Sequence, residues 1–369
     1  MRYAIAASAI CGLVAAAPQM INIEAALAVP TPTILGPKVE ETKAAPVSYN
    51  PTAAASAVAA IVKNEGAVEK RDAALSSCGA QQPGGFAPLP SSGSKDSDYT
   101  AEGSSLRALA NAATPPSGYT ESFKNKLGSS QQIGYLTYKN IDSQEYNVQA
   151  CADFCDSEKF CLGFNIFYER DPKFEPKEGC ANPEAQTNLK CSLYGYPVAE
   201  ATATNEGQWR GPQDTDGQAF HVVITGSNGY SKTGKGAPTV PDFNAPKDLP
   251  AAINAPLYQG KDTYNGMRLF NDNPYDPSLC AAACEAQTTY DKGHPAADGT
   301  YKPCNFFTSY ILTKNGVPLG TYCSLYTRSW GQEYAVNTGY YYGSDKYSVV
   351  NAASYEFPTF DNGNGGVPQ

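Results

Sequence analysis

The run Cys191-Ser192-Leu193-Tyr194 returns letter for letter as Cys323-Ser324-Leu325-Tyr326, and this repeat is the strongest structural signal in the chain. Ahead of each run lies a Cys-X-X-X-Cys pair, and between the pair and the run both copies have a cysteine with phenylalanine three residues after it. These cysteines are Cys151, Cys155 and Cys161 in the first copy and Cys280, Cys284 and Cys304 in the second. The matched positions lie about 130 residues apart, so the sequence predicts two copies of one unit.

Each copy contains the signals of one helix followed by strands. Asn147 and Asp276 are typical helix N-caps, and the two cysteines that follow each cap share one helical face. Residues 162–168 then alternate like a half-buried strand. Further along, an ungapped alignment places Tyr230 over Phe357. The sequence therefore predicts an α+β fold in which each unit packs one helix on a mostly antiparallel sheet.

The segments outside the two units have a different composition. An apolar run that ends in small residues is typical of a signal peptide and is too short for a membrane anchor, the alternative interpretation. Gly, Pro, Asn and Lys dominate the stretch between the copies, which is typical of a linker. The predicted segments are a signal peptide at 1–17, a largely disordered pro-region at 18–71, an extended N-terminal segment at 72–115, the first unit at 116–230, a linker at 231–256, the second unit at 257–360 and a flexible tail at 361–369.

The dibasic pair Lys70-Arg71 is typical of a processing site in a secreted chain. The alternative is an ordinary pair of exposed basic side chains. No other segment is long enough to cross a bilayer, and no hydrophobic tail follows the second unit. We therefore expect a secreted protein, extracellular or in a cell wall, without stable membrane insertion.

Charge and histidine content exclude several functional classes. The 369 residues include 27 Lys plus Arg against 36 Asp plus Glu, a net charge of −9, which disfavours a nucleic-acid partner. With 2 histidines, and cysteines without zinc spacing, we expect neither a metal site nor a cofactor. The sequence leaves the oligomeric state open.

The cysteine pattern resembles the PAN/apple module family. In that family a helix bears Cys-X-X-X-Cys, a central strand bears Cys with an aromatic residue three positions on, and the next strand bears Cys-X-Leu. The matching segments are Cys151–Cys155, Cys161–Phe164 and Cys191–Leu193, then Cys280–Cys284, Cys304–Phe307 and Cys323–Leu325. The layout is also similar to that of uncharacterised secreted proteins of filamentous fungi. An insertion before Cys304 departs from compact family members.

The resemblance implies disulfides, which an oxidising compartment permits. The implied pairs are Cys151–Cys191, Cys155–Cys161, Cys280–Cys323 and Cys284–Cys304. Cys78 and Cys180 have no counterpart in the other copy, and we expect them to pair with each other; unpaired thiols or other partners are the alternative. The resemblance also implies binding to extracellular protein or carbohydrate.

Aromatic residues are the best candidates for ligand contact. Trp209 and the run Tyr340-Tyr341-Tyr342 occupy the same place in the two copies, between paired glycines. Alternation along a strand places Tyr340 and Tyr342 on one face and Tyr341 on the other. One face is expected to be core and the other a binding surface, because Tyr and Trp combine flat apolar area with a polar group.

Carboxylates offer an alternative function. Glu169 and Asp171 follow the central strand of the first copy, where the second copy has Leu312-Thr313-Lys314. Two carboxylates suffice for glycoside hydrolysis, although a solvated ion pair explains the same residues. The sequence favours a non-catalytic binding protein with no catalytic residues. A secreted hydrolase of glycans and a structural component of a cell wall or spore coat are the alternatives.

Overall fold

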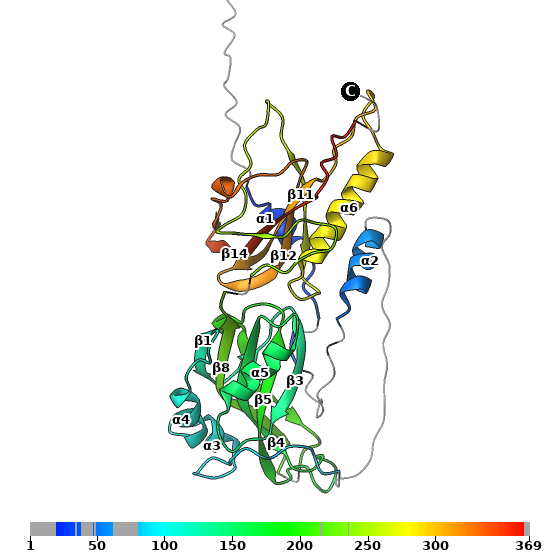
Figure 1. Ribbon diagram of the computed structural model, residues 1–369. Coiled ribbons are helices and arrows are strands. Elements are labelled where there is room, and N and C mark those ends of the chain that lie inside the picture. The colour runs from blue at the N-terminus through cyan, green and yellow to red at the C-terminus, as the bar shows by residue number, and fades with distance from the viewer. Residues whose placement is uncertain are drawn as a thin grey trace, which may run out of the picture.

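A computed structural model of the chain describes residues 20–33, 35–37, 47, 49–61, 80–214, 216–234 and 236–364 (Figure 1). The fold is α+β, with mostly antiparallel sheets and few helices, as the sequence predicts. The predicted signal peptide, the Lys70-Arg71 pair, Cys78 and the last part of the predicted tail lie outside the described residues. Within the described part of the chain, no helix is long and apolar enough to cross a membrane.

The first large sheet has the strand order β1-β8-β4-β5-β3, and β7 pairs with β8. Its strands are β1 (Tyr119–Lys126), β3 (Tyr135–Ile141), β4 (Gly163–Pro172), β5 (Ala185–Tyr194), β7 (Gly207–Arg210) and β8 (Phe220–Lys232). Helix α5 (Val148–Ser157) packs on one face of this sheet. The short strands β2 (Ser129–Ser130) and β6 (Ala203–Asn205) pair with each other, and the 3-10 turn η1 (Glu200–Thr202) immediately precedes β6.

The second large sheet has the order β10-β12-β11-β14-β13, and β9 pairs with β14. Its strands are β9 (Lys247–Leu249), β10 (Tyr264–Phe270), β11 (Phe306–Lys314), β12 (Val317–Tyr326), β13 (Gly339–Tyr342) and β14 (Asp345–Glu356). Helix α6 (Pro277–Gly293) packs on it, and the 3-10 turn η2 (Gln332–Tyr334) precedes β13. Helix α6 extends as far as Gly293, into the segment inserted before Cys304.

The two large sheets correspond strand by strand. A tyrosine just before each helix places its hydroxyl between two strands: Tyr146 lies 2.7 Å from the carbonyl oxygens of Ile166 and Gly226. Tyr275 makes the same bridge to Ser309, at 3.4 Å, and Asn351, at 3.0 Å. The strand pairing also corrects the sequence alignment. Tyr230 lies opposite Phe164 and Tyr355 opposite Phe307, so the counterpart of Tyr230 is Tyr355 and not Phe357.

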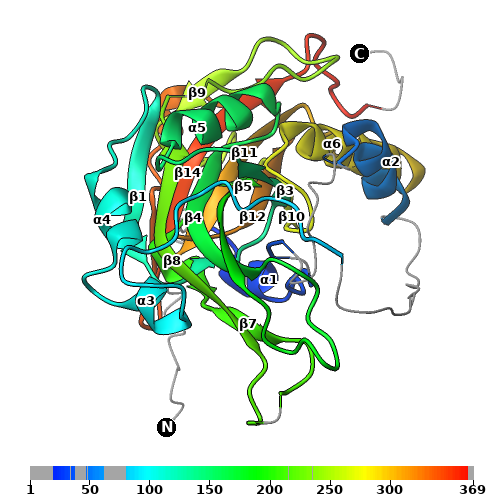
Figure 2. The same ribbon diagram turned by 90° about the horizontal axis from the view of Figure 1, so that it is seen from below.

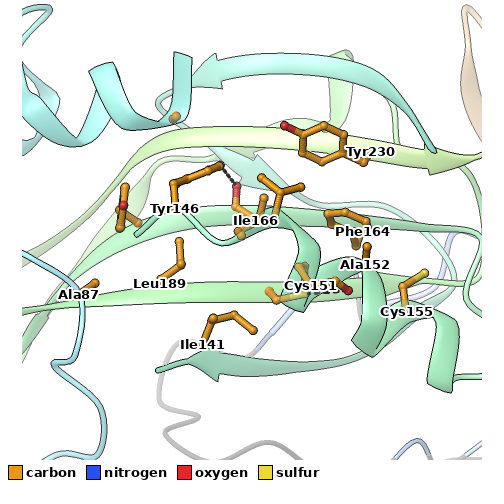
Figure 3. Packing of buried hydrophobic residues seen from close by; sticks show 14 of the residues in the cluster. Ala87, Ile141, Tyr146, Cys151, Ala152, Cys155, Phe164, Ile166, Leu189 and Tyr230 are labelled. Carbon is orange, nitrogen blue, oxygen red and sulfur yellow. Dashed lines mark hydrogen bonds between the residues drawn. A yellow bond between two sulfur atoms is a disulfide. The ribbon is translucent and has the colours of Figure 1, made fainter. Parts of the chain in front are cut away.

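Caps and disulfides fix each helix to its sheet. The side chain of Asn147 accepts a hydrogen bond from the backbone of Ala150, and Asp276 accepts one from Ser278. Figure 3 shows Cys151 and Ala152 of α5 facing the strands beneath. The disulfides are Cys151–Cys191, Cys155–Cys161, Cys280–Cys323 and Cys284–Cys304, the four pairs that the family resemblance implies. Cys180 is also disulfide-bonded. Because Cys78 lies outside the described residues, its pairing with Cys180 stays a prediction.

Short helices occur in the pro-region and in the segment 72–115 where the structure describes them. In the pro-region, α1 (Ile23–Leu27) packs on the second sheet, and α2 (Pro51–Ile61) lies alongside α6 in both views (Figures 1 and 2). In the segment 72–115, α3 (Asp96–Thr100) and α4 (Ser105–Ala112) contribute Tyr99, Leu106 and Ala110 to the first core. These short helices are held by tertiary burial, which composition does not reveal.

The predicted linker is packed and does not act as a free tether. Its strand β9 pairs with β14, Val240 is buried, and the ring of Phe243 lies 4.0 Å from that of Phe357. The two sheets also meet directly. The backbone N–H of Tyr275 donates to the carbonyl of Gly195 at 3.0 Å, and buried side chains of both units form one apolar cluster there.

Candidate functional site

The edge strands β7 and β13 begin at glycines in the same backbone conformation. Gly207 and Gly339 both have φ 108°. A Cβ atom would meet the backbone of the neighbouring strand at 2.1 Å at the first position and 2.0 Å at the second, so no other residue fits. Trp209 and Tyr341 each follow two residues later. They therefore occupy equivalent positions of the two sheets, as the sequence alignment predicts.

Trp209 and Tyr341 are both exposed, with relative exposures of 59% and 68%. Most tyrosines of the sheets are buried; those with less than 2% exposure include Tyr138, Tyr168, Tyr194, Tyr230, Tyr310, Tyr322, Tyr326, Tyr347 and Tyr355. The high tyrosine content is thus mainly a feature of the core. Against that background, an exposed aromatic side chain at the same position of both sheets needs a separate explanation.

Trp209 is held in place by a stacked histidine. The two residues lie opposite each other on β7 and β8, with ring centroids 4.0 Å apart and an angle of 11° between the ring planes. His221 Nδ1 lies 2.7 Å from Asp96 Oδ2, just inside α3. Hydrogen bonding with His221 lowers the pKa of Asp96 below its ordinary value. The indole is therefore backed by an imidazole and a carboxylate that are themselves fixed.

Tyr340 is half-buried and Tyr342 is 43% exposed, against 68% for Tyr341. As strand alternation predicts, both point to the other face, where they contact the N-terminal segment. Tyr340 Oη donates to the carbonyl of Ile21 at 2.6 Å, and Tyr342 Oη donates to Glu24 Oε1 at 3.1 Å. Trp209 and Tyr341 present their rings to solvent, whereas Tyr340 and Tyr342 bond the N-terminal segment, Tyr342 while still partly exposed. No ring contact joins Trp209 to Tyr341 among the described residues.

Glu169 and Asp171 are buried and share one cation. Lys190 Nζ contacts Glu169 Oε1 and lies 3.5 Å from Asp171 Oδ2, while Asn188 donates to Asp171 at 2.7 Å. Burial raises the pKa of Glu169 to about 8, Asp171 adds to the rise and Lys190 opposes it. Burial acts to lower the pKa of Lys190, but the two carboxylates outweigh it and raise that pKa.

This cluster has the geometry of a structural ion network. Glycosidases place their two carboxyl groups roughly 5–9.5 Å apart, on either side of the scissile bond. Glu169 and Asp171 instead contact a single ammonium between them, and each of the three side chains is no more than 10% exposed. A substrate would have to displace Lys190 to reach either carboxylate.

A cavity of about 760 Å³ lies between α2, α6 and the segment around residues 234–242. Asp242 and Glu285 are among its lining residues, and two further acidic side chains there serve local structure. Asp276 caps α6 and accepts a hydrogen bond of 2.7 Å from Tyr49, and Asp248 accepts one from the backbone of Ala237 at 3.0 Å. The wall is otherwise largely apolar or backbone, with Val240, Ala281 and Ala282 among its members.

Metal binding finds no support in the described part of the chain, where no cluster of three or more His, Cys, Asp or Glu side chains could hold an ion. Sequence reasoning missed His221 and Asp96 as partners of Trp209, because the pairing of β7 with β8 was not foreseen. It also missed the docking of residues 20–33 on the second sheet. No family model, no curated protein and no solved structure matches the chain.

Proposed function

We propose that this chain is a secreted, non-catalytic binding protein that recognises neutral extracellular carbohydrate through Trp209 and Tyr341. In this proposal the two sheets, each with its disulfide-linked helix, are two copies of a PAN/apple-like unit. The shared strand order, the equivalent tyrosine bridges and the four disulfides support a duplicated unit. Four disulfides also suggest an oxidising compartment.

The observation that carries the proposal is the pair of exposed aromatic side chains at one shared position. An exposed indole or phenol ring contributes nothing to the core, and an unsupported one at a sheet edge invites aggregation. Two edge strands that each begin at a required glycine present such a ring to solvent in both units. Use of this position for ligand contact in both units explains why both rings are exposed.

The chemistry around Trp209 suits a sugar better than a charged polymer. The rigid indole offers a flat apolar face, and His221 and Asp96 place hydrogen-bonding groups beside it. Because the chain carries a net charge of −9, acidic polysaccharides and nucleic acids are repelled overall. A neutral glycan brings hydroxyl groups and apolar ring faces without that penalty.

The test is a binding series with the full chain and single substitutions. The variants Trp209→Ala, Tyr341→Ala and the double variant are compared with the parent on a glycan array and then by titration with the glycan that binds best. Tyr290→Ala is the matched control, because Tyr290 is also exposed, at 52%, but lies on α6. Circular dichroism and the non-reducing mass establish that every variant keeps its fold and disulfides.

Each single substitution is expected to weaken binding of a repetitive glycan at least about tenfold, because one of two linked contacts is lost. The double variant should not bind, and Tyr290→Ala should bind like the parent. Unchanged binding by the double variant would refute the proposal. Absence of any glycan binding, together with capture of a purified extracellular protein that depends on Trp209, would assign the surface to a protein partner instead.

A further inference from the structure

The N-terminal segment covers the tyrosine-rich face of the second sheet. Ile21, Ile23 and Ala26 are each no more than 5% exposed and belong to the same apolar cluster as Tyr310, Leu312, Tyr322 and Tyr347. Figure 1 shows α1 beside the strands of this sheet, although helix and strands are far apart in the sequence. We call the surface formed by Tyr310, Tyr322, Tyr340 and Tyr342 the tyrosine face.

The tyrosine face holds the segment mainly through hydroxyl groups and backbone. The backbone N–H of Asn22 donates to Tyr322 Oη at 3.0 Å, and the carbonyl of Ile21 accepts from Tyr340 Oη at 2.6 Å. The hydroxyl of Tyr342 donates to the carboxylate of Glu24. A tyrosine hydroxyl that donates a hydrogen bond to the backbone, or accepts one from it, can form the same hydrogen bonds with a sugar hydroxyl.

The corresponding face of the first sheet is covered in a different way, by residues 83–85: the backbone N–H of Gly85 donates to Asn188, and the carbonyl of Pro83 accepts from Gln186. At the positions of Leu312 and Tyr322, counted from the matched cysteines, the first sheet carries Glu169 and Lys190. There the same strand order forms around a charged cluster, with β2 and β6 packed nearby. The apolar and tyrosine character of this face in the second sheet is therefore not demanded by the strand arrangement.

We propose that residues 20–30 are a removable cover of the tyrosine face, and that this face binds the same neutral carbohydrate as Tyr341 once the segment has left. The inference rests on the proposed function for the identity of the ligand, but not for the existence of the cover. Helix α1 has 5 residues, too few to persist alone, so its order depends on this docking. Cleavage at the predicted Lys70-Arg71 site would leave the segment held by non-covalent contacts only.

The test uses the full chain and two substitutions in α1. Ile23→Asp places a charge where the side chain is 2% exposed, whereas Leu27→Asp, the matched control, changes a side chain that is 46% exposed. Nitration by tetranitromethane, mapped by mass spectrometry, reports the accessibility of individual tyrosines. Tyr341 is the reactive reference in every sample, and Tyr355, buried on the α6 side, reports any loss of the fold.

Ile23→Asp is expected to raise the nitration rates of Tyr322 and Tyr340 roughly tenfold while Tyr355 stays protected, because local release needs only the contacts of α1 to open. Leu27→Asp should behave like the parent. The cover is refuted if Tyr322 and Tyr340 stay protected in Ile23→Asp. It is equally refuted if Tyr355 becomes reactive in step with them, since α1 would then be an integral part of the unit.

Binding of a soluble β-glucan and a chito-oligosaccharide by the same samples separates the two proposals. If the face is a binding site, Ile23→Asp binds one of these probes roughly tenfold more tightly than the parent and Leu27→Asp do. Equal affinity despite uncovered tyrosines would refute the binding role of the face. If neither the parent nor a variant binds any array glycan, the proposed function fails, whereas the nitration result still decides whether the cover exists.

Discussion

Glu169 and Leu312 lie at the same distance along the chain from Cys161 and Cys304, on the central strand of each sheet. One position holds an apolar side chain under α1, and the other holds a carboxyl group bound to Lys190. The sequence already showed this difference and left two interpretations open, an ion pair or a catalytic pair. Burial and the shared lysine support the first, because a buried unpaired carboxylate would be costly.

Glu169→Gln should reduce the pH dependence of stability. Because burial and Asp171 raise the pKa of Glu169 from 4.5 to about 8, the folded chain holds a proton that the unfolded chain releases. The free energy of unfolding should therefore fall as pH rises from about 4.5 to about 8, at roughly 1 kcal/mol per pH unit from this group. Urea unfolding at pH 5 and pH 8 measures the slope, which the variant should lack. Glu184→Gln, at an exposed position, should keep it, and an equal slope in Glu169→Gln would contradict the assignment.

At the scale of elements, two disulfides of different loop length hold each helix, and the difference is greater in the first unit. Cys151–Cys191 spans 40 residues of sequence, whereas Cys155–Cys161 spans 6. A crosslink that closes a longer loop removes more freedom from the unfolded chain. The long-range disulfide joins α5 to β5, so it also determines which strand the helix contacts.

Removing the long disulfide should therefore cost more stability than removing the short one. Cys151→Ala with Cys191→Ala is expected to lower the free energy of unfolding by roughly 1.5 kcal/mol more than Cys155→Ala with Cys161→Ala. Urea titrations of the two double variants give the comparison, since all four sulfur atoms are fully buried and the lost side chains are the same. Equal losses would mean that native packing, and not loop closure, governs the effect.

The helices, their caps and the α+β class could be predicted because they depend on local sequence and on cysteine spacing. The register of the strands was predicted less accurately. The ungapped alignment is two residues out along the whole strand: the pairing matches Val223 with Ser348 and Tyr230 with Tyr355, and no local sequence signal shows which residue lies opposite the central strand. Helix α1 was missed because Ile23 and the preceding Ile21 are stabilised by residues some 300 positions away, which no local pattern reveals.

At the scale of the whole molecule, the two sheets are parts of one packed body. The hydroxyl of Tyr196 lies 3.1 Å from Thr321 Oγ1 and 3.3 Å from the carbonyl of Phe270, both in the second unit. The N-terminal segment spans the junction as well: the carbonyl of Leu35 accepts from Gln132, and the ring of Tyr49 packs 4.8 Å from that of Phe160. The two exposed aromatics are thus held at a fixed separation, unlike sites on a flexible tether.

Gly195→Ala should disturb this junction. A Cβ atom at Gly195 would lie 2.1 Å from Pro274 Cβ and 2.7 Å from its Cα, so the two units must shift apart. We expect a loss of roughly 1–3 kcal/mol in the free energy of unfolding, as in other overpacked sites. Gly103→Ala is the control, because nothing lies within 4 Å of its added Cβ. Small-angle scattering would show the displacement, and an unchanged stability and scattering profile would contradict direct packing of the two units.

The most direct test of the aromatic binding surface is the fluorescence of Trp209 in a Trp330→Phe background, which leaves a single tryptophan. Titration with the best glycan should shift its emission to shorter wavelength in a saturable way, because a sugar ring removes water from the exposed indole. The midpoint should agree with the dissociation constant measured by calorimetry. A glycan that binds by calorimetry while the emission of Trp209 stays constant would contradict the account.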